Sequence, residues 1–156
     1  MIKLIRIDDR LVHGQVAFTW VPSLGIDCLI VANDKIARDD FQKMTLGLAK
    51  PAGVKLLIKS VADTIAFLND EKNKPAKILV LVNSVKDAAT LASGVSEISS
   101  INFGGIRAKE NAKLISKAVA LTDEDVVLIK ELLQKGIELE IRQVPTDEKQ
   151  KVGSLI

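Results

Sequence analysis

Short apolar runs alternate with amphipathic segments along the whole chain. The runs predict strands at residues 2–8, 27–32, 54–58, 77–82, 98–103, 117–121 and 137–144. The segments between them carry apolar residues at helical spacing and predict helices at 15–20, 39–50, 60–68, 84–93 and 122–135. This alternation is typical of a parallel α/β sheet, and the nearly continuous apolar runs predict strands covered on both faces.

The ends of these elements carry the residues expected there. Ser60 and Thr122 stand where helix caps are expected, and acidic residues follow both. Pro22 and Gly25 are predicted to end the first helix. No internal repeat, linker or low-complexity segment interrupts the pattern. Residues 1–156 are therefore predicted to form a single α/β domain, a mainly parallel open sheet with helices on both faces.

Composition excludes several classes of protein. A net charge of +2 and an aromatic content of 3% offer neither the basic surface nor the stacking platforms of a nucleic-acid-binding protein. The apolar runs are far shorter than the roughly 20 residues of a membrane helix, and no signal-peptide pattern opens the chain. Cys28 is the only cysteine, so no intramolecular disulfide can form, and its apolar neighbours predict a buried strand residue. These features favour a cytoplasmic protein.

The candidate chemistry lies in the loop after the first predicted strand, at residues 8–15. This loop contains His13, the only histidine of the chain, at the change from strand to helix. In open α/β sheets, ligands bind beyond the carboxyl ends of the strands. The loop after the first strand is therefore the predicted active loop.

Three interpretations of His13 remain open at this point. The first is a structural histidine at a helix start. The second is a metal ligand, which is the weakest because one histidine and one cysteine do not make a zinc site. The third is a covalent phosphoryl carrier, because a neutral imidazole nitrogen is abundant at neutral pH and can attack phosphorus directly.

The neighbours of His13 suit the third interpretation. Arg10 can bind phosphoryl oxygens with a guanidinium fork, and the N–H groups of Gly14 and Gln15 can add donors at the helix start. Asp8 or Asp9 could orient Arg10 or select the tautomer of the imidazole, or could simply cap the turn. No metal is expected to take part.

The loop resembles the opening of a known family. Residues Arg6-Ile7-Asp8-Asp9-Arg10-Leu11-Val12-His13-Gly14-Gln15-Val16 are similar to the start of the IIB component of the bacterial phosphoenolpyruvate-dependent sugar phosphotransferase system, mannose/fructose/sorbose family. The resemblance extends to residues 31–34, 101–105 and 118–122, and so covers nearly the whole chain.

This resemblance implies a phosphotransferase that takes part in sugar uptake. His13 is expected to accept a phosphoryl group, on Nδ1, from a phosphohistidine of the IIA component. It would then pass the group to a sugar translocated by the membrane IIC/IID components, with which the protein would be peripherally associated. Arg10 matches the phosphate-binding arginine of the family. No cofactor is implied, and the sugar is not determined because substrate choice is expected to reside in the membrane components.

Other interpretations stay open beside this one. The protein could be a non-catalytic α/β interaction or regulatory protein, with His13 structural or phosphorylated only as a signal. Lys35 and Arg38 are either docking residues or ordinary solvated charges. Gly104-Gly105 forms either a tight turn or a phosphate contact, and Trp20 either packs the first helix or stacks on a sugar.

Overall fold

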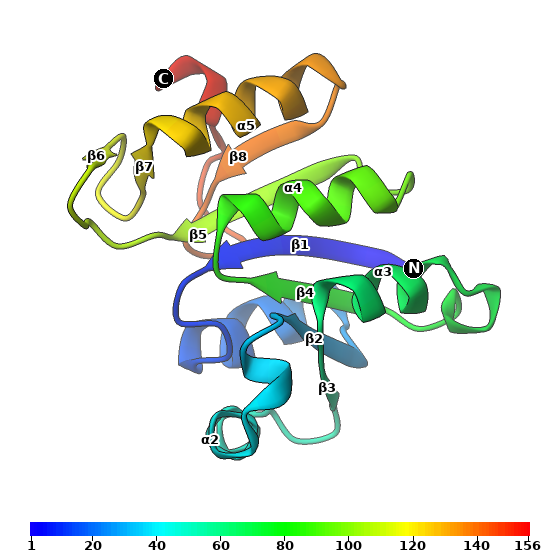
Figure 1. Ribbon diagram of the computed structural model, residues 1–156. Helices are drawn as coiled ribbons and strands as arrows, with labels where there is room; N and C mark the ends of the chain where they lie inside the picture. The colour runs from blue at the N-terminus through cyan, green and yellow to red at the C-terminus, as the bar shows by residue number, and fades with distance from the viewer.

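A seven-stranded sheet forms the centre of the molecule, with strand order β3-β2-β4-β1-β5-β8-β9 (Figure 1). The computed structural model describes residues 1–156. The strands are β1 (Ile2–Asp8), β2 (Cys28–Ala32), β3 (Lys55–Lys59), β4 (Ile78–Val82), β5 (Ser100–Gly105), β8 (Glu138–Ile141) and β9 (Gln150–Lys151). All neighbouring strands are parallel except β8 and β9. The predicted α/β fold with a mainly parallel sheet is confirmed.

Helices cover both faces of this sheet because the inner strands are apolar on both sides. Side chains alternate along β4: Val80 and Val82 belong to one core cluster, and Leu79 and Leu81 to the other. The helical elements are η1 (Val16–Trp20), α1 (Val21–Leu24), η2 (Ile36–Arg38), α2 (Asp40–Leu48), α3 (Val61–Asn69), η3 (Glu71–Asn73), α4 (Val85–Gly94), α5 (Asp123–Gln134) and η4 (Val152–Ser154). The larger core lies under α3, α4 and α5, and the smaller under η1 and α1.

The order of the strands places β1 at the middle of the sheet. The chain runs from β1 outward to β2 and β3, returns through β4, and then continues past β1 to β5 and β8. Figure 1 shows the resulting layers, with α3 and α4 on one side of β1 and the helix that follows β1 on the other. A ligand site is expected at the carboxyl end of strands where the direction of winding reverses, which is where β1 ends.

Two predicted strands differ from the structure. Residues 117–121 do not join the main sheet: β7 (Ala120–Thr122) pairs with β6 (Ala112–Leu114) in a separate antiparallel hairpin. The last strand stops at Ile141 instead of Val144, because the carbonyls of Arg142 and Gln143 turn inward to accept hydrogen bonds from Arg6. The short strand β9 carried no detectable pattern in the sequence.

The first helix extends beyond its predicted end. Pro22 does not stop it, because the π-helical turn η1 leads into α1 and Pro22 stands in the first turn of α1, where its missing N–H costs little. Gly25 ends the helix, as predicted, with a left-handed φ of 63°. The helix therefore reaches Leu24 and brings Trp20 over the sheet.

The helix α2 forms as predicted but buries none of its residues. Phe41, Met44 and Leu48, which stand at helical spacing, point to solvent and are 60% to 85% exposed. Only Leu46 and the following Ala49 pack against the smaller core. The helical pattern was therefore correct, whereas the apolar face does not contribute to the core.

The capping box at the start of α5 allows a stability prediction. The Thr122 hydroxyl accepts a hydrogen bond from the Asp125 N–H (3.1 Å), and the Asp125 carboxylate accepts one from the Thr122 N–H (3.1 Å). Thr122→Ala is expected to lower the free energy of unfolding by about 1 kcal/mol. Thr90→Ala on the exposed side of α4 is the control, with a change within about 0.5 kcal/mol. Equal effects of the two variants in urea unfolding would contradict the assignment.

Candidate functional site

A tight turn after β1 brings His13 back toward the end of the strand. The Asp9 N–H donates to the Gly105 carbonyl (2.9 Å), and the Leu11 N–H donates to the Asp8 carbonyl (2.9 Å). Leu11 has a positive φ of 57°, a left-handed conformation that is uncommon outside glycine. Its buried side chain holds this conformation by packing in the smaller core. The turn therefore places the residues after β1 against Asp8.

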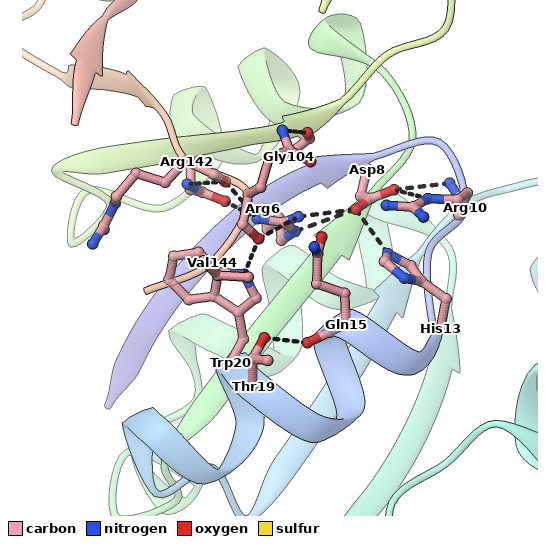
Figure 2. A network of polar contacts seen from close by, with 12 residues as sticks. Arg6, Asp8, Arg10, His13, Gln15, Thr19, Trp20, Gly104, Arg142 and Val144 are labelled. Atoms are coloured by element: carbon pink, nitrogen blue, oxygen red, sulfur yellow. Dashed lines mark hydrogen bonds and ion pairs between the residues drawn. The ribbon is translucent and has the colours of Figure 1, made fainter. Parts of the chain in front are cut away.

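Asp8 is the centre of the site. Its side chain is fully buried, and its Oδ2 accepts a hydrogen bond from His13 Nε2 at 2.8 Å (Figure 2). Its Oδ1 accepts bonds from the backbone N–H of Arg10 (3.1 Å) and from Arg10 Nε (3.4 Å). Burial raises the pKa of Asp8, but the hydrogen bonds from His13 and Arg10 and the charge of Arg6 outweigh burial and lower that pKa to about 2. Asp8 is therefore a carboxylate at neutral pH.

An ionised Asp8 determines which nitrogen of His13 carries the proton. A carboxylate can only accept hydrogen bonds, so in neutral imidazole the proton resides on Nε2 and the lone pair on Nδ1. The His13 side chain is 15% exposed. Nδ1 is thus the nitrogen that has nucleophilic character.

The surroundings of His13 are suited to an anion. A helical segment begins at Gly14, and the His13 carbonyl accepts a hydrogen bond from the Ala17 N–H (3.0 Å). The N–H groups of Gly14 and Gln15 belong to the first turn, which has no preceding helical carbonyl to bind them. Half of the Arg10 side chain is exposed, and its two terminal nitrogens make no hydrogen bond within the protein. The loop therefore presents a guanidinium and a helix start beside the imidazole.

Asp9 does not join this cluster. Its carboxylate accepts hydrogen bonds from the Arg107 N–H (2.8 Å) and from Arg107 Nε (3.0 Å), and it has no hydrogen bond to Arg10 or His13. It ties the loop to the segment that follows β5. The structure thus separates two acidic neighbours that the sequence left equivalent.

Arg6 is the residue of this site to which sequence reasoning gave no role. It lies on the same face of β1 as Asp8 and is completely buried. Its Nε and Nη2 donate to Asp8 Oδ2 at 3.3 and 3.1 Å, and its Nη1 donates to Asn102 Oδ1 at 2.7 Å. Burial lowers the pKa of the Arg6 guanidinium, whereas the charge of Asp8 opposes that shift. An arginine between the apolar residues Ile5 and Ile7, on the same strand face as Asp8, was the available signal.

Gly104 has a structural role that neither sequence interpretation offered. It is part of β5 and forms no turn, and a Cβ at this position would lie 2.2 Å from Arg6 Cζ. Figure 2 shows the Arg6 guanidinium between Gly104 and the Trp20 ring, whose centroid is 5.2 Å away. Trp20 is 1% exposed, and its indole N–H donates to the Gln143 carbonyl at 2.9 Å. Trp20 therefore packs the helix against the network and has no surface for a sugar.

With this geometry established, comparison with known proteins shows the family. A family model described as "PTS system sorbose subfamily IIB component" matches residues 2–156. The chain belongs to this IIB family. The recognition of the motif around His13 is confirmed, and the protein is a component of a sugar phosphotransferase system.

Relatives of this IIB chain match over its full length. It is 38% identical to a probable phosphotransferase enzyme IIB component of Streptococcus pyogenes serotype M6, covering 100% of this chain and 99% of the relative. It is 36% identical to the mannose-specific EIIAB component of Escherichia coli K12, covering 100% of this chain and 48% of that protein. The crystal structure of the IIBSor domain of the sorbose permease from Klebsiella pneumoniae superposes with a TM-score of 0.94 at 28% identity, covering 99% of this chain and 95% of that one.

The remaining candidates of this IIB chain lie outside the His13 cluster. Arg38 lines a cleft of about 520 Å³ at the carboxyl ends of β2 and β3, separated from β1 by β4, and Lys35 immediately precedes η2. Cys28 is buried, as predicted. No set of three or more His, Cys, Asp and Glu side chains is placed to hold a metal ion. None of the helices combines the length and the apolar composition needed to cross a membrane.

Proposed function

We propose that this IIB protein carries a phosphoryl group on Nδ1 of His13, between a IIA donor and a sugar. The observation that supports this proposal is the 2.8 Å contact between His13 Nε2 and Asp8, because it directs the proton to Nε2 and the lone pair to Nδ1. Asp8 thereby orients the imidazole. Asp9 orients the loop from its other side through Arg107.

The reaction balances without a cofactor. Nδ1 attacks the phosphorus of a phosphohistidine on IIA, a new N–P bond forms, and the N–P bond of the donor breaks. Arg10 and the N–H groups of Gly14 and Gln15 bind the equatorial oxygens during this step. In the second step a sugar hydroxyl attacks the same phosphorus and releases its proton to a base or to water at the sugar site, while the N–P bond to His13 breaks and Nδ1 recovers its lone pair. The proton on Nε2 stays in its bond to Asp8 throughout.

The family and one relative support the proposed partners. The E. coli relative is named an EIIAB component, and the present chain corresponds to about half of it. We infer that residues 1–156 form one IIB domain that receives its phosphoryl group from a IIA protein or domain. The membrane IIC/IID components would take the sugar, which places the IIB protein in the cytoplasm, peripherally associated with the transporter.

The direct test is phosphorylation of the purified protein. It would be incubated with phosphoenolpyruvate, the general phosphotransferase proteins and a IIA protein shown separately to be phosphorylated. Mass spectrometry is expected to find one acid-labile phosphoryl group, and phosphorus NMR is expected to assign it to Nδ1. If none is found, the proposal fails and a non-catalytic interaction protein becomes the better interpretation.

Arg10→Lys tests the guanidinium fork. A lysine keeps the charge but cannot bind two phosphoryl oxygens with one planar group, so the initial rate of phosphorylation is expected to fall about 10-fold. Arg38→Lys makes the same exchange at the distant cleft and is the control, with a rate close to that of the wild type. Equal rates for Arg10→Lys and wild type would remove the phosphate-binding role of Arg10.

A further inference from the structure

The Arg6 guanidinium is held on every side. It has five N–H donors, and they make five hydrogen bonds: two to Asp8, one to Asn102 and one each to the carbonyls of Arg142 and Gln143. One face lies over Trp20, and the other lies so close to Gly104 that no side chain fits there. An arginine fixed in this way cannot turn toward another partner.

Arg6 does not touch the space where a phosphoryl group would bind. It contacts His13 only through Asp8, whose Oδ2 receives both Arg6 and His13 Nε2. Two bonds from one rigid guanidinium define the position of that oxygen. The direction of the His13 Nε2–H bond is therefore set by a residue on the other side of the carboxylate.

The charge of Arg6 matters as much as its position. A buried carboxylate that faced an imidazole alone would draw a second proton onto the ring and remove the lone pair from Nδ1. Arg6 and Arg10 both bind Asp8 and offset its charge. A second ion pair lies next to this cluster: Arg142 Nη2 is 3.0 Å from Glu140 Oε1, and Glu140 accepts a hydrogen bond from Asn102. Because its two charges cancel, this pair adds little net charge. Arg6 is thus the only fully buried cation that binds Asp8.

We propose that Arg6 is a positioning residue for phosphoryl transfer, which acts through Asp8 to keep Nδ1 of His13 unprotonated and correctly aimed. This inference rests on the proposed function for the use made of Nδ1. Its effect on the imidazole itself is independent of any phosphoryl donor. Gly104 contributes to this arrangement, because the absence of a side chain there makes room for the Arg6 guanidinium.

Because the chain has a single histidine, the protonation of its ring can be measured without overlapping signals. Nitrogen NMR of protein labelled with histidine that carries ¹⁵N in the ring alone shows only Nδ1 and Nε2 of His13. The wild type, without any donor, is expected to show a protonated Nε2 and an unprotonated Nδ1. In Arg6→Met the protonated fraction of Nδ1 is expected to rise at neutral pH, and the initial rate of phosphorylation by IIA is expected to fall at least about 10-fold.

Arg142→Met made together with Glu140→Gln, which leaves no unpaired buried charge, is the matched control. Arg142 also lies against Trp20, at 5.1 Å, but its side chain pairs with Glu140 and does not bind Asp8. This control should leave the ring nitrogens in their wild-type state. A purely structural role for Arg6 predicts that the two variants differ in stability only, with the same nitrogen spectrum.

Two further variants keep the test decisive if Arg6→Met does not fold. Gly104→Ala keeps every charge and displaces the guanidinium, so it should change the nitrogen spectrum in the same direction. Arg6→Met in an Asp8→Asn background removes both members of the buried pair, which is milder for folding than removing one. Because Arg6 acts through Asp8, the rate of this double variant should lie within about twofold of Asp8→Asn alone.

The outcomes separate the two proposals. A wild type that a phosphorylated IIA cannot charge overturns the proposed function, and the role of Arg6 in transfer with it. A wild type that is charged, combined with unchanged ring nitrogens in Arg6→Met and Gly104→Ala, overturns only the role of Arg6. If adding Arg6→Met to Asp8→Asn lowers the phosphorylation rate as much as Arg6→Met does in the wild type, the proposed role of Arg6 is also overturned. Arg6 would then act by a route other than Asp8.

Discussion

His13→Ala is expected to abolish phosphoryl incorporation while leaving the protein folded. The chain has no second histidine that could accept the group, so the rate should fall at least about 1,000-fold, to the background of the assay. The fold should persist, because the side chain contributes one hydrogen bond to Asp8, and Arg6 and Arg10 still bind that carboxylate. The loss of stability is expected to be about 1–2 kcal/mol.

The measurement for His13→Ala combines phosphoryl transfer with unfolding. Mass spectrometry after incubation with phosphorylated IIA reports the transfer, and the fluorescence of the single tryptophan during urea unfolding reports the fold. A variant that unfolds like the wild type but takes up no phosphoryl group would establish His13 as the acceptor. Undiminished uptake by the variant would place the acceptor on another residue and reject the proposed function.

Asp8→Asn is expected to cost both activity and stability. An amide can donate toward His13 and favour the tautomer with the proton on Nδ1, so phosphorylation should slow about 100-fold or more, as expected when a carboxylate that orients a catalytic histidine becomes an amide. The variant also leaves the buried Arg6 without its counter-charge, which costs about 3–5 kcal/mol. Initial rates and urea unfolding measure the two effects.

The pH dependence of Asp8→Asn provides an independent check. The pKa of Asp8 is about 2 in the folded protein and about 3.9 in an unfolded chain. Its ionisation therefore stabilises the wild type above pH 4, and this contribution of about 2–3 kcal/mol is lost as the pH falls toward 2. The stability difference between wild type and variant should shrink over that range.

Asp9→Asn is the control for Asp8→Asn. Asp9 makes an exposed ion pair with Arg107, so its loss is expected to cost no more than about 1 kcal/mol. It should also change the phosphorylation rate far less than Asp8→Asn does. Equal effects of the two substitutions would show that Asp8 has no special relation to His13.

The architecture was predictable because it rests on local patterns. Apolar runs such as Ile78–Val82 are buried on both faces, and the hydroxyls of Ser60 and Thr122 cap their helices as expected. The position of His13 was predictable for the same reason, since the strand, the turn and the helix start follow one another in the sequence. Each of these signals extends over only a few neighbouring residues.

The inner part of the site was less accessible to sequence reasoning. Strand alternation puts Leu4, Arg6 and Asp8 on one face of β1, but the sequence interpretation treated Asp8 and Asp9 alike and did not use this alternation to separate them. The partners of Arg6 at Asn102 and beyond are far away in the sequence and follow no local pattern. The apolar residues around Val119 were also misplaced by sequence reasoning, because their composition does not distinguish a strand of the main sheet from one of a small hairpin.

The position of β1 has a consequence for the synthesis of the protein. Among the strands of this sheet β1 is made first, yet both of its neighbours, β4 and β5, are made much later, and the carbonyls that bind Arg6 belong to residues 142 and 143. The His13 loop therefore cannot reach its final geometry until almost the whole chain has emerged. Chains that lack residues 142 and 143 would carry the histidine without its ordered surroundings, so the proposed phosphoryl chemistry requires the last strands of this sheet to have been made.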